Sequence, residues 1–302
     1  MSSKTVIISG ANGYFGSIAC QYFKKQGWQV LKGTRQQDAD IKIDLDAVDD
    51  LVKQTVSTPV DLFIHAAAAH EVTCRENPYT SICQNIVGTK AALDFCLSNN
   101  IPKFVYLSTF HVFGHPSGTI DESVQPLPAN DYGLSHLQAE EYVQMYNRES
   151  KIQGTVIRPS NFFGIPANLK KFNRWTLVPV SFCQEAVLNK QIILKTPGTQ
   201  KRNFIGVNDI CATLEKLFFL QENIPLIHLT GNDNLSIKEL AQLVCQIMKT
   251  HFDKEIELTI PEGVQASDDF SYESKFLSQI HQPIEEIEDF LIEFCRLLKQ
   301  QS

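Results

Sequence analysis

Apolar residues in the first half of the chain gather in short, nearly continuous runs, separated by segments of helical spacing. Runs without polar alternation are typical of parallel strands that are covered on both faces. These runs are TVIIS (5–9), WQVLKG (28–33), VDLFIHAA (60–67), KFVYLST (103–109) and GTVIRPS (154–160). The helical segments between them are 18–26, 47–56, 85–99 and 135–148. This alternation of strand and helix predicts an α/β fold with a doubly wound, Rossmann-type parallel sheet.

The second half of the chain has a different pattern. Residues 165–202 contain several prolines and lack the alternation, and strands are predicted again at 203–207 and 226–230. Ser236, with Glu239 three residues later, predicts a capping box at the start of a helix. Residues 284–299 carry apolar residues at helical spacing with charges of both signs, which predicts a surface helix.

These patterns divide the chain into two domains. Residues 1–164 are predicted to form a Rossmann-type domain, completed by about 203–230. Residues 165–202 and 231–302 are predicted to form a smaller substrate-binding domain.

Composition narrows the class of protein. The 302 residues are 43% hydrophobic and 20% charged, as in an ordinary soluble protein. The formal net charge of −7 argues against a nucleic-acid partner, because phosphate binding needs a basic surface. No apolar run reaches the length of a transmembrane helix, so no membrane partner is expected.

The cysteines and histidines indicate neither disulfides nor a metal. The eight cysteines are scattered, without a CxxC pair, which predicts reduced thiols in a cytoplasmic protein. His111 and His115 have no carboxylate or cysteine at ligand spacing, so no metal site is expected.

A glycine-rich turn follows the first predicted strand and opens the first helix. Gly10-Ala11-Asn12-Gly13-Tyr14-Phe15-Gly16 has glycines where a dinucleotide-binding turn needs a tight bend, close approach of the backbone to a pyrophosphate, and close helix packing. The helix N-terminus would present free N–H groups to the phosphates. We therefore expect cofactor contacts from Gly10, Asn12, Gly13, Tyr14, Phe15 and Gly16.

The residues after the second strand favour NADP over NAD. An acidic residue there would bind the ribose 2′-OH of NAD, but this chain has Gly33-Thr34-Arg35. Arg35 could pair with a 2′-phosphate, and Thr34 lies beside it. Asp44 and Leu45, after the third short strand, are candidates to hold the adenine.

Further segments follow the glycine turn in a recognisable order. They are His65-Ala66-Ala67-Ala68, Asn77-Pro78 with Asn85-Ile86-Val87-Gly88-Thr89, Leu107-Ser108-Thr109 with Val112-Phe113-Gly114, Arg158-Pro159-Ser160-Asn161-Phe162-Phe163-Gly164, and Arg202-Asn203-Phe204-Ile205 with Val207 and Asp209. Together they resemble the extended short-chain dehydrogenase/reductase family, in its nucleotide-sugar epimerase, dehydratase and reductase branch, over nearly the whole chain. The resemblance implies further cofactor contacts at Ala66, Ala67, Ala68, Asn85, Ser108, His136 and Pro159.

The acid/base motif of that family, YxxxK, is altered here. Tyr132-Gly133-Leu134-Ser135-His136 keeps the tyrosine but has histidine in place of lysine, with both positions on one helical face. The resemblance implies that Tyr132 exchanges a proton with the substrate, that Thr109 binds the same substrate oxygen, and that position 136 serves the tyrosine and the ribose. Histidine titrates near 6.5, so His136 would be charged only part of the time and would lower the pKa of Tyr132 less than lysine does. Reduction needs a protonated phenol and oxidation a phenolate, so the change favours reduction.

The resemblance also implies where a sugar linked to a nucleoside diphosphate would bind. Arg202 matches the arginine that reaches the diphosphate, Asn161 lines the sugar pocket, and His70, Thr109, Phe110 and His111 are further candidates. Phe110 and His111 stand where 4,6-dehydratases have an Asp-Glu pair, so dehydration is not expected.

The sequence thus favours an NADP(H)-dependent reductase of a nucleotide-linked keto-sugar. An epimerase, or a cofactor-binding protein that has lost catalysis through His136, stays open. The resemblance further implies a homodimer, through the helices near 85–99 and 135–148.

Overall fold

The structure is a computed structural model and describes residues 3–37, 39–263 and 270–301. Within these ranges, seven parallel strands form one sheet in the order β11-β7-β5-β4-β1-β2-β3. The strands are β1 (Thr5–Ser9), β2 (Gln29–Thr34), β3 (Ile41–Lys42), β4 (Leu62–His65), β5 (Lys103–Leu107), β7 (Gln153–Pro159) and β11 (Leu226–Leu229). The predicted doubly wound sheet is confirmed. Strand order reverses between β1 and β4, where such a sheet opens a crevice at its carboxyl edge.

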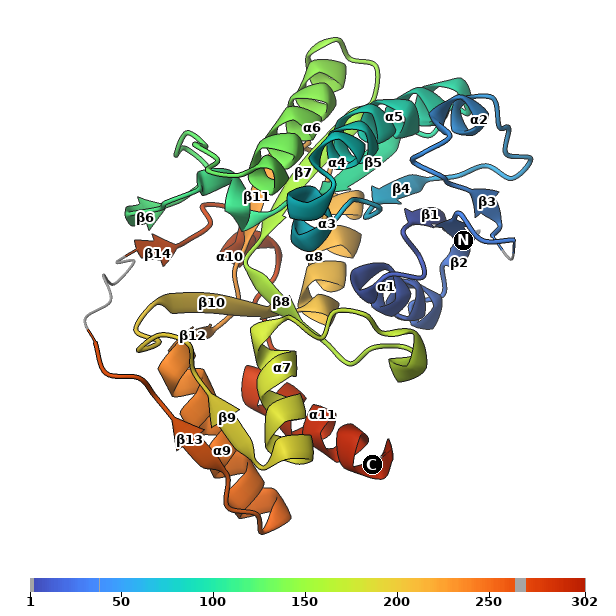
Figure 1. Cartoon of the computed structure of the whole chain (residues 1–302). Coiled ribbons are helices and arrows are strands. Elements are labelled where there is room, and N and C mark those ends of the chain that lie inside the picture. The colour runs from blue at the N-terminus through green and yellow to red at the C-terminus, as the bar shows by residue number, and fades with distance from the viewer. Residues whose placement is uncertain (1–2, 38, 264–269, 302) are drawn as a thin grey trace.

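Helices cover both faces of this sheet (Figure 1). On one face lie α1 (Tyr14–Lys25) and α8 (Val207–Phe219); on the other lie α2 (Val48–Val52), α5 (Gly88–Ser98) and α6 (Asp131–Arg148). The β1 side chains alternate between the two layers: Ile8 belongs to the core with α1, and Ile7 to the core with α5, both fully buried. Double coverage explains why the strands are continuously apolar.

Short elements connect these layers. They are α3 (Glu71–Glu76), α4 (Pro78–Ile82), a π-helical turn (Cys83–Val87), a 3-10 turn (Phe110–Phe113), and β6 (Gly118–Ile120), which pairs with β14 (Phe270–Tyr272). The π-helical turn runs into α5 and makes one continuous helical segment with it.

The second part of the molecule lies below the carboxyl edge of the sheet in Figure 1. It contains a three-stranded sheet of β8 (Asn161–Phe163), β10 (Lys201–Gly206) and β12 (Asp233–Ser236), and a pair formed by β9 (Gln191–Ile193) and β13 (Glu257–Thr259). Its helices are α7 (Val178–Gln184), α9 (Ile237–Phe252) and α11 (Ile287–Gln301), with a 3-10 turn (Leu169–Lys171) and a π-helical turn (Glu185–Asn189). The short helix α10 (Leu277–Ile280) packs against α8 and β11 of the first part.

The strands expected to complete the first domain divide between the two parts. β11 joins the edge of the large sheet, whereas β10 pairs with β8 and β12 in the small sheet. One continuous hydrophobic core, which includes Ile8, Phe204 and Phe294, joins the two parts. The position of a strand in a sheet depends on pairing partners far away in sequence, which local patterns do not specify.

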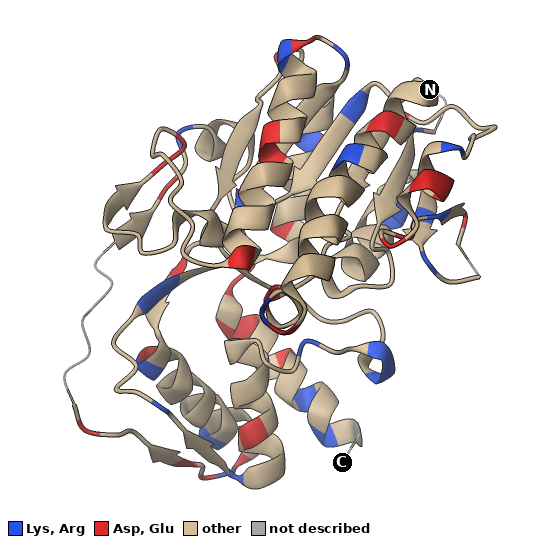
Figure 2. Ribbon diagram, turned by 45° about the horizontal axis from the view of Figure 1, so that its top comes forward, with Lys and Arg blue, Asp and Glu red and all other residues tan. Residues whose placement is uncertain are grey.

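The predicted capping box of α9 is present. The Ser236 hydroxyl accepts from the Glu239 amide at 3.1 Å, and the Glu239 carboxylate accepts from the Ser236 amide at 2.7 Å. The predicted surface helix is α11, which buries Ile287, Phe290 and Leu291 on its inner face. Acidic and basic residues are interspersed over both parts (Figure 2). None of the helices in the described ranges is long and apolar enough to span a membrane.

Candidate active site

The glycine-rich turn connects β1 to α1 at the point where strand order reverses. Gly10 has a φ of +67°, and a Cβ there would lie 2.9 Å from the Ala66 carbonyl oxygen. A Cβ on Gly16 would lie 2.2 Å from the Gly10 carbonyl oxygen, so α1 can approach the turn only with glycine there. No side chain caps the N-terminus of α1, and its first turn has no acidic residue. The backbone N–H groups of this turn are therefore suited to the pyrophosphate of a dinucleotide.

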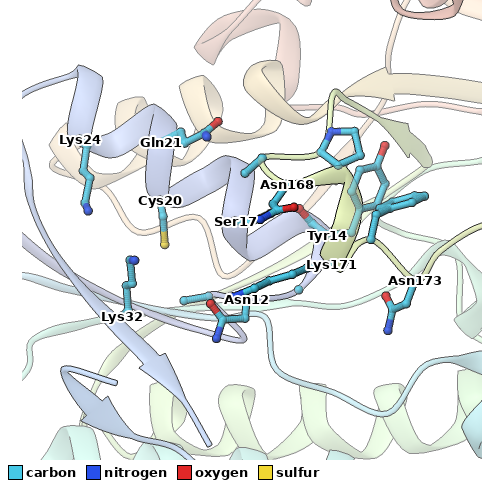
Figure 3. Close-up of a pocket in the computed structure, with 15 residues that line it drawn as sticks. Asn12, Tyr14, Ser17, Cys20, Gln21, Lys24, Lys32, Asn168, Lys171 and Asn173 are labelled. Atoms are coloured by element: carbon cyan, nitrogen blue, oxygen red, sulfur yellow. The ribbon is translucent and has the colours of Figure 1, made fainter. Parts of the chain in front are cut away.

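A pocket of about 230 Å³ lies beside this turn (Figure 3). Asn12 lines it together with Lys24 of α1, Lys32 of β2 and Lys171 of the 165–202 segment, and its described lining contains no Asp or Glu. Figure 3 shows Lys24 and Lys32 near Cys20 at one end of the pocket. The pocket is therefore suited to an anion. Arg35 lies just beyond β2 with an exposed side chain.

The other residues expected near the adenosine lie at the ends of β2 and β3, where their side chains shape the loops. The Thr34 hydroxyl accepts from the Gln36 amide at 2.9 Å, and Asn12 donates to the Gln36 side chain at 2.8 Å. Asp44 accepts from the Asp46 amide at 3.2 Å. Leu45 packs against Gly88, where a Cβ would lie 2.9 Å from its Cδ2 atom.

The segment after β4 is fixed by Ser9, a residue that the sequence analysis did not single out. Its hydroxyl oxygen accepts from the amides of Ala66 and Ala67, both at 3.0 Å. Its own proton therefore points to His65 Nδ1, 2.8 Å away. Burial lowers the pKa of His65 to about 3, so the ring is neutral. Ala68 is exposed beside this segment.

Asn85 also holds the segment after β4 in place, through two side-chain hydrogen bonds. Its side-chain oxygen accepts from the Ala69 amide at 2.7 Å, and its side-chain nitrogen donates to the Ser135 hydroxyl at 2.9 Å. The contact links the residues after β4 to α6.

Tyr132 and His136 share one face of α6, as their spacing predicts. Asn130 caps this helix by accepting from the Gly133 amide at 2.8 Å. The rings of Tyr132 and His136 meet edge to face with centroids 4.7 Å apart. Burial raises the pKa of Tyr132 to about 12, against the opposite effect of a hydrogen bond with Thr109. The structure thus brings Tyr132, Thr109 and His136 together.

His136 is more deeply buried than its motif position indicates. The side chain is only 2% exposed, and burial lowers its pKa to about 3. Its Nδ1 atom lies 2.7 Å from the Tyr106 hydroxyl. The sequence predicted a ring that is charged part of the time; in the structure the ring is neutral at pH 7, because a surface reference pKa does not apply to a buried imidazole.

A buried ion pair, which the sequence analysis did not predict, lies behind the end of β5. Arg158 contacts the Glu140 carboxylate at 2.6 Å, and both side chains are at most 5% exposed. Ser108, an expected cofactor contact, donates its hydroxyl proton to Glu140. Pro159 ends β7 directly after this arginine and is buried. Glu140 lies two helical turns after Tyr132, on the same helix. This spacing was the one sign in the sequence that Glu140 lies near the site.

The expected substrate residues form two groups. His111 is next to Tyr132, with the ring centroids 5.6 Å apart, and His70 caps α3. Asn161 of β8 and Arg202 of β10 lie in the small sheet, where Asn161 donates to the Asn203 carbonyl at 3.1 Å. Arg202 lines a second pocket of about 500 Å³ with Lys201 and Asn203.

Phe110 belongs to neither group. Its ring stacks on Phe270, with centroids 5.4 Å apart, in a small hydrophobic cluster with Tyr272. The described residues contain no cluster of three or more metal-ligating side chains.

Comparison with known proteins identifies the family of this chain. Residues 6–222 match the family described as NAD dependent epimerase/dehydratase. The chain belongs to this family. It is an enzyme of the NAD(P)-dependent nucleotide-sugar epimerase, dehydratase and reductase type, and the resemblance inferred from its motifs is confirmed.

Similar members of the epimerase/dehydratase family carry several activities. GDP-6-deoxy-D-talose 4-dehydrogenase of Aggregatibacter actinomycetemcomitans is 27% identical over 80% of this chain and 79% of its own. A putative UDP-glucose 4-epimerase of Methanocaldococcus jannaschii is 25% identical over 79% and 81%. Among solved structures, RMD from Pseudomonas aeruginosa complexed with NADPH has a TM-score of 0.84 at 18% identity, with 99% of both chains covered.

Proposed function

We propose that this enzyme reduces a nucleotide-linked keto-sugar with NADPH, with Tyr132 as the proton donor. The observation that carries the proposal is the absence of a cation beside Tyr132 among the described residues of its motif: His136 is buried, and its pKa is about 3. Burial also holds the pKa of Tyr132 at about 12. A phenol that keeps its proton at pH 7 is suited to donate it.

Reduction of a ketone adds a hydride to the carbonyl carbon and a proton to its oxygen, and the hydride is what a bound NADPH would supply. Tyr132 would give the proton to that oxygen and Thr109 would orient the same oxygen. The cofactor would be held by the glycine turn at Gly10 and Gly16, where any Cβ would fill the cradle. His136 would line the nicotinamide end.

Preference for NADPH is supported by the charges around the adenosine end. Arg35 is exposed after β2, and Lys24, Lys32 and Lys171 line the adjacent pocket. These cations suit a 2′-phosphate, which an acidic residue would repel. RMD, whose structure has a similar fold, was solved with NADPH.

A substrate that carries a diphosphate is supported by the second pocket. Arg202 and Lys201 line it, and a guanidinium suits phosphate oxygens. The relative from Aggregatibacter acts on a GDP-sugar, and a UDP-glucuronic acid 4-epimerase from Bacillus cereus, with a TM-score of 0.78, was solved with UDP-glucuronic acid and NAD.

Purified enzyme, NADPH and a panel of GDP-, UDP- and dTDP-linked 4-keto-sugars test the proposal. We expect loss of NADPH absorbance with at least one sugar, and an alcohol product. Tyr132→Phe should lower kcat about 100-fold or more, whereas Tyr142→Phe on the same helix should not. An enzyme that binds NADPH and oxidises none of it across the panel would contradict a reductase.

Epimerase activity is the main competing outcome. An epimerase would purify with bound NAD and interconvert sugar isomers without net use of cofactor. Releasing and identifying the bound dinucleotide separates the two activities. Absence of turnover with every sugar, reversed by His136→Lys, would instead indicate a binding protein that has lost catalysis.

We also propose a homodimer through α5 and α6. Leu97 of α5 and Leu134 of α6 are 44% and 47% exposed, and Val87 beside α5 is 44% exposed. Light scattering on the purified protein should give twice the chain mass, and Leu97→Glu should halve it.

A further inference from the structure

The segment between β8 and α7 lies against the glycine-rich turn. Figure 1 shows these residues, 164–177, extending from β8 toward α1 before they return to α7, and we call them the strap. The Phe172 ring of the strap meets the Tyr14 ring edge to face, with centroids 5.1 Å apart. Where the strap begins, the Gly164 carbonyl accepts from the Tyr14 hydroxyl at 2.7 Å. The strap is therefore attached to the wall of the crevice that follows β1.

Arg174 of the strap reaches the opposite wall. Its Nη2 atom lies 2.9 Å from the Glu71 carboxylate, and Glu71 is the first residue of α3. Because α3 follows β4, and strand order reverses between β1 and β4, the two partners come from opposite sides of the crevice. Asn85 holds the Ala69 amide just before α3, so this wall is fixed too.

The Arg174–Glu71 ion pair lies at the mouth of the crevice. The two side chains are 18% and 39% exposed, whereas Ser9, at the floor, is fully buried. Burial acts to raise the pKa of Glu71, but the Arg174 guanidinium outweighs burial and lowers that pKa, so both partners are charged at pH 7. Since each side chain keeps some contact with water, either charge can be solvated when the pair separates. The contact can therefore open without a large cost.

We propose that Arg174 and Glu71 form a clasp over the bound dinucleotide, which must open for the cofactor to enter or leave. The turn at Gly10 and Gly16 would receive the pyrophosphate at the floor of the crevice, and the clasp joins the two walls above it. The inference goes beyond the proposed function, because the clasp would hold NADPH and NAD alike. An enzyme that consumes NADPH exchanges its cofactor in every turnover, so opening of the clasp would be part of its cycle. An epimerase would keep the clasp closed.

Release of the reduced dinucleotide from the whole enzyme tests the clasp without any sugar. NADPH or NADH is bound first, and its fluorescence is followed by stopped flow after an excess of the oxidised form is added. Glu71→Gln and Arg174→Met each remove the ion pair, so the dissociation rate constant should rise about 3- to 10-fold. Glu76→Gln, at the exposed end of α3, is the matched control and should leave this rate unchanged. Glu71→Arg combined with Arg174→Glu should restore slow release.

The direction of the Glu71→Gln effect separates the clasp from a phosphate-binding site. If Arg174 binds a cofactor phosphate, Glu71 competes for it, and Glu71→Gln should slow release and tighten binding. That result, or an unchanged rate in both single variants, would overturn the clasp. Slow release of NADH alone, accelerated in both variants, would support the clasp and overturn the proposed preference for NADPH. Binding of neither dinucleotide would overturn both proposals.

Discussion

The Tyr132 ring meets the His136 ring edge to face, with centroids 4.7 Å apart, and neither ring carries a charge at pH 7. The family motif has a lysine at this position, four residues after the tyrosine. Here the tyrosine has an aromatic, uncharged neighbour instead. The Tyr132 phenol is therefore protonated at neutral pH.

Restoring the charge should raise the rate of alcohol oxidation. In His136→Lys an ammonium beside Tyr132 should lower the phenol pKa by about 1 unit or more, so that oxidation of the alcohol by NADP⁺ at pH 8 rises about 10-fold. His136→Gln has no charge and is the control. The measurement is kcat/KM for oxidation between pH 6 and 10. Superimposable profiles for the two variants would show that charge at this position is irrelevant.

Selection of NADPH should depend on Arg35. Arg35→Ser removes a cation that suits the 2′-phosphate, so KM for NADPH should rise about 10-fold while KM for NADH stays unchanged. Arg148→Ser, at the exposed end of α6, controls for loss of a surface charge. If Arg35→Ser raises both KM values equally, the side chain serves the binding loop and does not read the phosphate.

Much of this site could be predicted because its signals are local. The turn at Gly10 and Thr109 follow the ends of β1 and β5, and parallel strands bring such ends to one edge. Tyr132 lies in the first turn of α6, within a short motif. The Glu140–Arg158 pair, the Ser9–His65 contact and the Tyr106–His136 contact join residues 18, 56 and 30 positions apart. Their side chains meet only after the sheet forms, and burial then sets their protonation. Sequence spacing carries no information on that burial.

Gly10 has two reasons to be glycine, a positive φ and a close contact with Ala66, and Gly27 allows the two effects to be measured separately. Gly10 and Gly27 both have positive φ, +67° and +85°, but a Cβ on Gly27 would meet nothing within 4 Å. Gly27→Ala should cost about 1 to 2 kcal/mol of strain. Gly10→Ala adds a 2.9 Å contact with the Ala66 carbonyl, so it should destabilise more and abolish NADPH binding. Urea unfolding and fluorescence titration with NADPH check this; equal stability and equal binding in the two variants would contradict it.

The Glu140 carboxylate should matter for stability far more than its neighbour in sequence. Glu140→Gln leaves the Arg158 cation buried without its counter-charge and should cost about 3 kcal/mol or more. Glu141 contacts Arg148 at 3.9 Å with both side chains more than half exposed. Glu141→Gln should therefore cost less than about 0.5 kcal/mol. If urea unfolding shows a similar loss of stability in Glu140→Gln and Glu141→Gln, the charges of the buried pair do not stabilise the fold.

Buried neutral histidines should make the fold sensitive to acid. Burial lowers the pKa of His65 and His136 to about 3 and that of His228 to about 4. An unfolded histidine titrates near 6.5, so below that pH the unfolded chain binds more protons than the folded one. Stability is then fully present above pH 6.5 and falls as the pH drops toward 4, by about 1.4 kcal/mol per pH unit for each such histidine.

His136→Gln should remove one of these contributions and flatten the fall of the unfolding free energy between pH 6 and 4 by that amount. His115→Gln, at an exposed loop position, should leave the slope as it is. Urea unfolding at half-unit steps measures both. An unchanged slope in His136→Gln would mean that His136 takes up its proton in the folded state, and a charged imidazole beside Tyr132 would then act as lysine does in the family motif.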